Sequence, residues 1–90
     1  MSAPLHIASK VGDTFTVKQL LLAGANVHDG ATSALHLAAM GGHTETVKLL
    51  MLFGAQSTLD NDNKTPSQLA IQSGHLKTAE ILTKSNFFTY

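Results

Sequence analysis

Residues 34–50 read ALHLAAMGGHTETVKLL and place apolar residues on both sides of a Gly-Gly-His junction. Related stretches occur upstream, PLHIASKVGDTFTVKQLL at 4–21, and downstream, SQLAIQSGHLKTAEIL at 67–82. Residues 3–25 and 33–55 are identical at 12 of 23 positions when shifted by 30, and residues 33–53 and 65–85 at 6 of 21 when shifted by 32. The chain therefore contains three copies of one pattern.

Each copy predicts two short helices. In the third copy, Thr65 is an N-cap candidate, and Pro66 takes the first helical position, where a missing N–H has no consequence. Ser33 is the corresponding N-cap candidate in the second copy. Glycines mark the predicted helix ends, because they readily enter the left-handed region. The first helices end at Gly12, Gly42 and Gly74, and the second helices end at Gly24 and Gly54.

The second helix of the middle copy carries Val47, Leu50 and Met51 at the i, i+3, i+4 spacing of a buried stripe. A helix pair this short cannot bury such a stripe alone, but a stack of pairs can. The spacing predicts an all-α solenoid. Alanines on the first helices would let neighbouring pairs approach closely, and leucines would fill the layer behind: Ala8, Ala38 and Ala70, then Leu20, Leu50 and Leu82.

Composition restricts the class of protein. Ninety residues with 43% apolar and 13% charged side chains suit one packed domain. Six basic and six acidic residues give zero net charge, without the basic cluster of a nucleic-acid binder. The absence of cysteine excludes disulfides, thiolate zinc sites and cysteine nucleophiles. Apolar runs such as 49–53 are much shorter than the roughly 20 residues of a membrane span.

The motifs APLHIA (3–8), SALHLA (33–38) and TPSQLA (65–70), followed by GD, GGH and SGH, resemble the ankyrin repeat. The resemblance implies three helix-turn-helix repeats joined by β-turn or hairpin loops, within one domain over residues 1–90. The implied repeats cover about 2–31, 32–62 and 63–86, with a tail at 87–90. Asp29-Gly30 and residues 61–63 are turn formers in the connecting loops.

Three departures from the family pattern affect this interpretation. The first two copies are 30 residues apart rather than 33, which shortens the loop around Asp29. The third copy has Ser67-Gln68 in place of Leu-His and a polar second helix, which is typical of a C-terminal cap. Ala3 is a poor helix cap, so either Ser2 substitutes for it or the first copy was cut from a longer array.

The histidines have two interpretations. The resemblance implies that His6 and His36 bond to a capping hydroxyl and to loop backbone, and that His43 and His75 support the start of the second helix. The rival is a metal site, but zinc needs three or four ligands and no carboxylate recurs beside these positions. We therefore expect structural histidines and no bound metal.

Two further motifs resemble known ligand-binding loops only weakly. Gly41-Gly42 lacks the preceding strand and the Gly-Lys-Ser/Thr ending of a phosphate-binding loop. Asp60, Asp62 and Lys64 lack the glycine and glutamate of a calcium-binding loop. We therefore expect a helix end at Gly41-Gly42 and a polar turn at Asp60, Asp62 and Lys64. We expect no cofactor and no enzymatic activity.

The resemblance implies a protein-interaction module that binds another protein through the concave face. Met40 is of special interest as an adaptable apolar contact, although packing against its own loop is an equal alternative. The aromatic residues Phe87, Phe88 and Tyr90 either cover the last helix pair or anchor a partner. The implied partner-binding positions are Lys10, Val11, Met40, Gly41, Gln72 and Ser73 on the helices, and Asp29, Gly30, Thr32, Asn61, Asp62 and Lys64 in the loops.

An alternative function is a structural segment of a longer ankyrin array, which mainly stacks on further repeats of a parent protein. In either case we expect a monomer without nucleic-acid or membrane partners. The N-terminus has no charged segment followed by an apolar one, which argues against a secretory signal. We expect an intracellular protein of the cytoplasm or nucleus.

Overall fold

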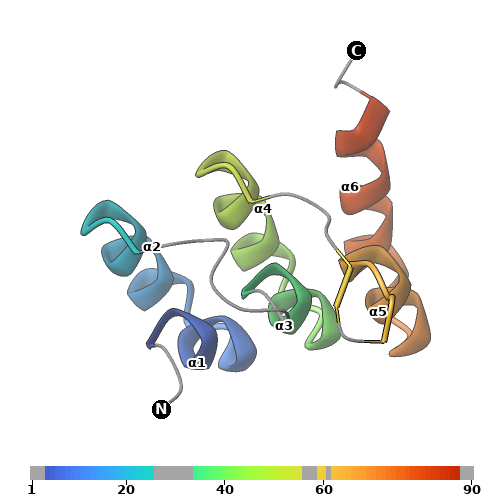
Figure 1. Cartoon of the computed structure of the whole chain (residues 1–90), viewed down its shortest axis with the longest axis horizontal. Helices are drawn as coiled ribbons and strands as arrows, with labels where there is room; N and C mark the ends of the chain where they lie inside the picture. The colour runs from blue at the N-terminus through green and yellow to red at the C-terminus, as the bar shows by residue number, and fades with distance from the viewer. Residues whose placement is uncertain (1–3, 26–33, 56–58, 61, 88–90) are drawn as a thin grey trace.

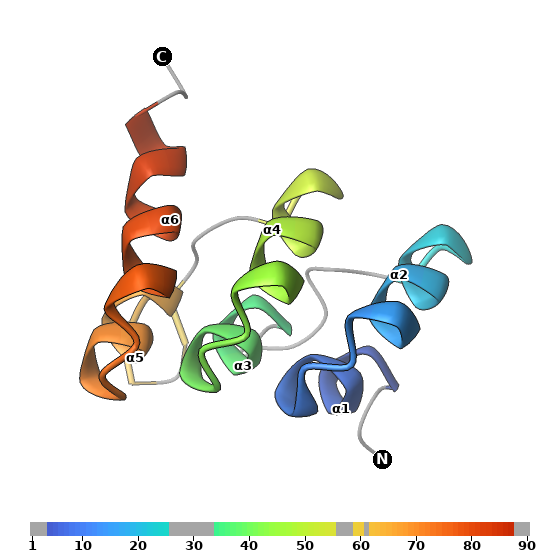
Figure 2. The ribbon, with the colours of Figure 1, turned by 180° about the vertical axis from the view of Figure 1, so that it is seen from behind.

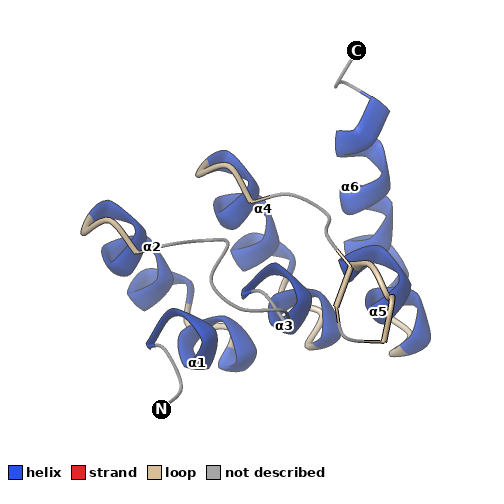
Figure 3. Cartoon of the chain, in the orientation of Figure 1, coloured by secondary structure: helices blue, strands red, loops and turns tan. Residues whose placement is uncertain are grey.

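Three helix pairs make up the structure, which is a computed structural model that describes residues 4–25, 34–55, 59–60 and 62–87. The first pair is α1 (Pro4–Val11) and α2 (Thr14–Leu22), and the second is α3 (Ala34–Met40) and α4 (Thr44–Leu52). The third is α5 (Pro66–Gln72) and α6 (Leu76–Phe87). The described part of the chain contains no strand (Figure 3). The predicted all-α class is confirmed.

The helices form two layers, which Figure 1 shows from one side and Figure 2 from behind. Helix α3 packs between α1 and α5 in the inner layer, and α4 packs between α2 and α6 in the outer layer. Each inner helix also contacts the outer helix of its own pair. The result is the predicted side-by-side stack, in which each pair is a neighbour of the next.

The inner helices end in one repeated hydrogen-bond arrangement. Gly12, Gly42 and Gly74 have φ values of 78°, 70° and 83°, in the left-handed region. The next residue along the chain donates its N–H back to the carbonyl of an alanine: Asp13 to Ala8 at 3.0 Å, His43 to Ala38 at 2.9 Å and His75 to Ala70 at 2.8 Å. This is a Schellman-type helix end, and it reverses the chain into the outer helix. The predicted outer-helix ends at Gly24 and Gly54 also have positive φ.

Helix α5 begins at a complete capping box. The Gln68 N–H donates to the Thr65 hydroxyl at 3.1 Å, and the Thr65 N–H donates to Gln68 Oε1 at 2.9 Å. Pro66 occupies the first turn. The N-cap predicted at Thr65 is thus confirmed, and Gln68 adds a role that the sequence interpretation did not assign. The N-cap predicted at Ser33 lies outside the described residues.

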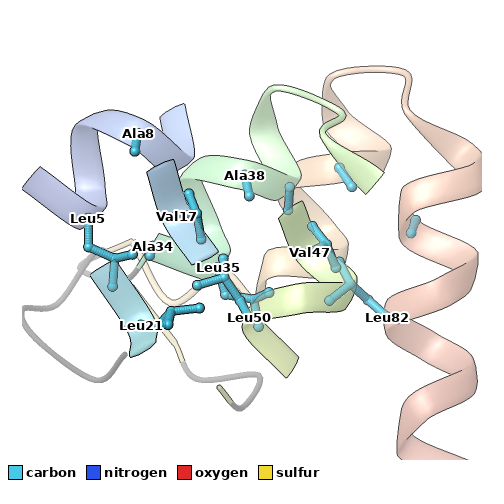
Figure 4. Packing of buried hydrophobic residues seen from close by; sticks show 13 residues of the cluster. Leu5, Ala8, Val17, Leu21, Ala34, Leu35, Ala38, Val47, Leu50 and Leu82 are labelled. Atoms are coloured by element: carbon cyan, nitrogen blue, oxygen red, sulfur yellow. The ribbon is translucent and has the colours of Figure 1, made fainter. Parts of the chain in front are cut away.

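The core runs between the two layers, and Figure 4 shows its side chains from close by. The three alanines of the inner helices, Ala8, Ala38 and Ala70, are at most 5% exposed and permit the close approach that was predicted. Leu50 and Leu82 are also buried.

The prediction for Leu20 is wrong in part. Leu20 is only partly buried, and the adjacent Leu21 is buried in its place, at 5% exposure. The physical reason is the position of the first repeat in the stack: Leu50 and Leu82 each face a preceding helix pair, whereas among the described residues no pair covers Leu20.

Candidate protein-binding surface

One exposed residue per repeat follows the inner helices in register. Lys10, Met40 and Gln72 occupy the same repeat position, and all three are exposed, Met40 at 40%. We call these three residues the inner-helix row. Because α3 packs directly on α1 and α5, successive members are separated by about the 8–10 Å of packed helices. The row therefore places a cation, a thioether and an amide on one continuous surface.

The next position of each inner helix is also exposed, but it points in another direction. Val11, Gly41 and Ser73 are exposed, as predicted for contact residues. Val11 lies four residues after Ile7 on α1, so these two side chains share one face of the helix. That face is turned about 100° from the face of Lys10. Val11 thus belongs to the end of the stack more than to the inner-helix row.

The carboxylate of Asp60 organises the loop before α5. The sequence analysis did not assign this role to Asp60. Asp60 Oδ1 accepts from the Asp62 N–H at 2.8 Å and from the Lys64 N–H at 2.9 Å. The Asp60 N–H in turn donates to the Lys64 carbonyl at 3.0 Å, and Asn63 adopts a φ of 59°. The only signal in the sequence is an Asp at the start of a run of turn formers.

Hydrogen bonding also lowers the pKa of Asp60. The N–H of Lys64 stabilises the charged carboxylate most, and partial desolvation opposes it; the Asp62 N–H and electrostatic interactions with His36 and Lys64 add to the lowering. The pKa therefore lies below its ordinary value of 3.8. The Asp60 carboxylate therefore stays charged under physiological conditions and continues to organise the loop.

His36 connects this loop to the inner layer. Its ring is fully buried, and Nε2 lies 2.9 Å from the Lys64 carbonyl oxygen. Met40 follows His36 by one turn on α3, about 6 Å along the helix axis. The loop is thus held beside the inner-helix row, with Asp62 exposed and Lys64 half-buried. The predicted bond from this histidine to loop backbone is confirmed.

Four of the predicted contact residues cannot be placed against this surface. Asp29, Gly30, Thr32 and Asn61 lie outside the described residues. Of the aromatic tail, Phe88 and Tyr90 lie outside them as well, and Phe87 is the last residue of α6, without a described side chain.

A second polar region lies at the turns between inner and outer helices. His43 is the N-cap residue of α4, but its ring makes no capping bond. Its Nε2 instead lies 3.0 Å from the Lys10 carbonyl oxygen of the preceding repeat, and the ring packs against Gly12. This histidine therefore joins two repeats. The prediction of individual helices from the sequence could not indicate a contact between repeats.

Hydroxyl pairs reinforce the same joints. Thr14 and Thr46 are 2.9 Å apart, and Thr44 and Thr78 are also 2.9 Å apart. An open cleft of about 310 Å³ lies here, lined by Gly12, Thr14, Gly42, His43, Thr44, Glu45 and Thr46. Because its main polar side chains already bond across the repeat boundary, we interpret this cleft as a structural joint.

Within the described ranges, no three histidine, aspartate or glutamate residues are grouped so that they could hold a metal ion. None of the described helices is long and apolar enough to cross a membrane.

A family model described as ankyrin repeats (3 copies) matches residues 5–89, nearly the whole chain. The chain belongs to the ankyrin-repeat family. A search of curated proteins found no match. Ankyrin repeats are generally protein-interaction modules and are typically non-catalytic. Stacked repeats in general form an extended concave surface.

Proposed function

We propose that this chain is a non-catalytic ankyrin domain that captures a partner protein through its concave face, inside the cell, in the cytoplasm or nucleus. The contact residues are the inner-helix row, the neighbouring Gly41 and Ser73, and the exposed Asp62 and Lys64 side chains of the loop. Val11 and the undescribed Asp29, Gly30, Thr32 and Asn61 complete the proposed set at its edges. The repeats at about 2–31, 32–62 and 63–86 act as one domain.

The observation that carries this proposal is the chemical variety of one exposed position. Some buried repeat positions, such as Ala8, Ala38 and Ala70, carry the same residue in the three copies because they form the same contacts. The inner-helix row instead carries Lys, Met and Gln on a constant backbone. Three different groups at fixed spacing can distinguish between partner sequences, whereas packing within the stack does not require this variety.

Met40 is the expected centre of the contact. It is the only apolar member of the row, its neighbour Gly41 has no side chain to obstruct approach, and a flexible thioether adapts to different apolar surfaces. Central apolar contacts usually contribute most of the binding energy, and surface ion pairs contribute little. The Cα trace extends only 29 Å along its longest axis, so we expect a short peptide or a small patch of a protein, bound with micromolar affinity.

A peptide selection tests this proposal without knowledge of the natural partner. Peptides selected from a random displayed library on the folded chain should shift the amide NMR signals of Lys10, Met40, Gln72 and Asp62. Met40→Ala should raise the Kd at least about tenfold, and Asp62→Lys combined with Lys64→Glu should change peptide preference. The Lys64 reversal retains the main-chain atoms that bond to Asp60 and His36.

Leu52→Ala is the matched control, since Leu52 is 81% exposed on the outer helix α4. It removes apolar surface from the opposite layer and should leave the Kd unchanged. Met40→Ala and Leu52→Ala should both have the same melting temperature as the parent. Selected peptides that lose affinity with Leu52→Ala and not with Met40→Ala would overturn the concave-face assignment.

A further inference from the structure

The spacing of the inner-helix row is fixed by matching contacts at the two repeat boundaries. A histidine ring of one repeat packs against a glycine of the repeat before it, His43 against Gly12 and His75 against Gly42. A pair of threonine hydroxyls, 2.9 Å apart, also joins the outer helices across each boundary. Because the two boundaries are built alike, the three members of the row are held at two nearly equal steps along the stack.

Each step is about 8–10 Å, the distance between packed helices, because α1, α3 and α5 lie side by side in the inner layer (Figure 1). A ligand that contacts all three members must present three side chains on one side at the same interval. This requirement restricts the backbone conformation of the ligand, because each regular conformation repeats at its own interval.

Three regular conformations can be compared with this step. A β-strand returns side chains to one face after two residues, about 6.6 Å, and after four, about 13 Å, so neither interval matches. An α-helix returns only after seven residues, about 10.5 Å, and its face turns by about 20° over each heptad. Polyproline II has three residues per turn and a rise of about 3.1 Å, so every third side chain points the same way at about 9.3 Å. Polyproline II therefore matches both steps of the row, and it needs only seven residues to do so.

The side chains of the row specify the order of chemical groups on the ligand. Lys10 is exposed and forms no ion pair with another residue that the structure describes, so its ammonium group favours an acidic residue. Met40, at 40% exposure, favours an apolar residue in the middle. The exposed amide of Gln72 can donate and accept, and it favours a polar residue. The complementary order is acidic, apolar and polar.

We propose that the partner presents a proline-rich segment in the polyproline II conformation. Its acidic residue binds Lys10, an apolar residue three positions away binds Met40, and a polar residue three positions further binds Gln72. This inference rests on the proposed function and names the class of peptide that the concave face captures. Prolines at the intervening positions hold the segment extended before it binds, which lowers the entropy cost of binding. The row selects the order of groups and accepts both chain directions, because every third residue shares one face in either.

Synthetic peptides test the interval directly, by fluorescence anisotropy on the whole chain. Glu-Pro-Pro-Leu-Pro-Pro-Gln and its reverse carry the three groups at three-residue intervals. Glu-Pro-Leu-Pro-Gln carries them at two-residue intervals, and a helical 15-residue peptide carries them at seven-residue intervals. One of the two seven-residue peptides should bind at least about tenfold more tightly than the other two designs. Tighter binding of the short or helical peptide, or no binding of either seven-residue peptide at about 1 mM, overturns the proposal.

Charge reversal tests the order of groups. Lys10→Glu should raise the Kd of the acidic peptide about threefold to tenfold, and should lower the Kd of the same peptide with Lys in place of Glu. The main-chain carbonyl that His43 contacts is retained. Lys18→Glu is the matched control, since it makes the same charge change at an exposed position of the outer helix α2 and should leave both Kd values unchanged. Equal effects of the two variants would show that net charge, and not the row, selects the peptide.

The peptide class and the proposed function can fail separately. Library-selected peptides that lose affinity with Met40→Ala but lack the three-residue interval would overturn the polyproline II inference and leave the concave-face function intact. Selected peptides that lose affinity only with Leu52→Ala would overturn both.

Discussion

The first and third repeats have the same two-helix backbone but end the stack in different ways. The first repeat exposes Ile7 and Val11, and its Asp13 bonds only within its own turn. The third repeat starts with the capping box of Thr65 and closes its outer side with the Ser67–Thr83 hydroxyl pair. The contrast shows that the contribution of a repeat to the stability of the stack depends on which of its two faces is covered.

The largest expected effect comes from equivalent leucines at the two ends. Leu82→Ala removes a side chain that is 1% exposed, and should lower the free energy of unfolding by about 2–5 kcal/mol. Leu20→Ala removes the same group from a partly covered site and should cost about 1 kcal/mol. Urea denaturation followed by circular dichroism measures both. Equal losses would show that the two ends are covered equally.

A smaller effect distinguishes two glycines with similar backbone. Gly12 and Gly74 have φ values of 78° and 83°, so alanine is strained at both, by about 1–2 kcal/mol. At Gly12 the new methyl group would also collide with the His43 ring, whereas at Gly74 no atom lies within 4 Å. Gly12→Ala should therefore cost about 1 kcal/mol more, because His43 loses its bond to the Lys10 carbonyl. Thermal unfolding of both variants provides the measurement, and a larger loss for Gly74→Ala would contradict the assigned contact.

The smallest expected effect is the acid response of the first repeat. The Thr16 hydroxyl, and then the Thr16 N–H, hold the pKa of Asp13 below its ordinary value of 3.8. A lowered folded-state pKa means that the stabilisation is fully present above the unfolded-state value and is lost as pH falls through the folded-state value. The parent should therefore lose stability more steeply below about pH 4 than Asp13→Asn, which does not titrate. Equal slopes in urea titrations at pH 2–5 would exclude this contribution, and the carbon NMR signal of the Asp13 carboxyl gives its midpoint directly.

Much of the fold was predictable from local rules. The glycines at 12, 42 and 74 predicted helix ends because few other residues enter the left-handed region without strain. Thr65 and Pro66 predicted a helix start because a cap and a first turn have characteristic residues. The inner-helix row was predicted through the family resemblance, since Lys10, Met40 and Gln72 occupy one repeat position. The role of Asp60 was missed, because an aspartate in a polar turn has many possible partners and its sequence context does not select one.

The sequence by itself determined the repeated helix pair, its turns and the order of the repeats, because these depend on residues only a few positions apart. Only the tertiary structure decided that Leu21 rather than Leu20 is buried in the first repeat, that His43 reaches the Lys10 carbonyl, and that Ile7 is exposed while Leu69 is covered. These outcomes depend on which neighbour a helix pair has on each side. Two equivalent residues with the same local sequence pattern can therefore differ completely in burial.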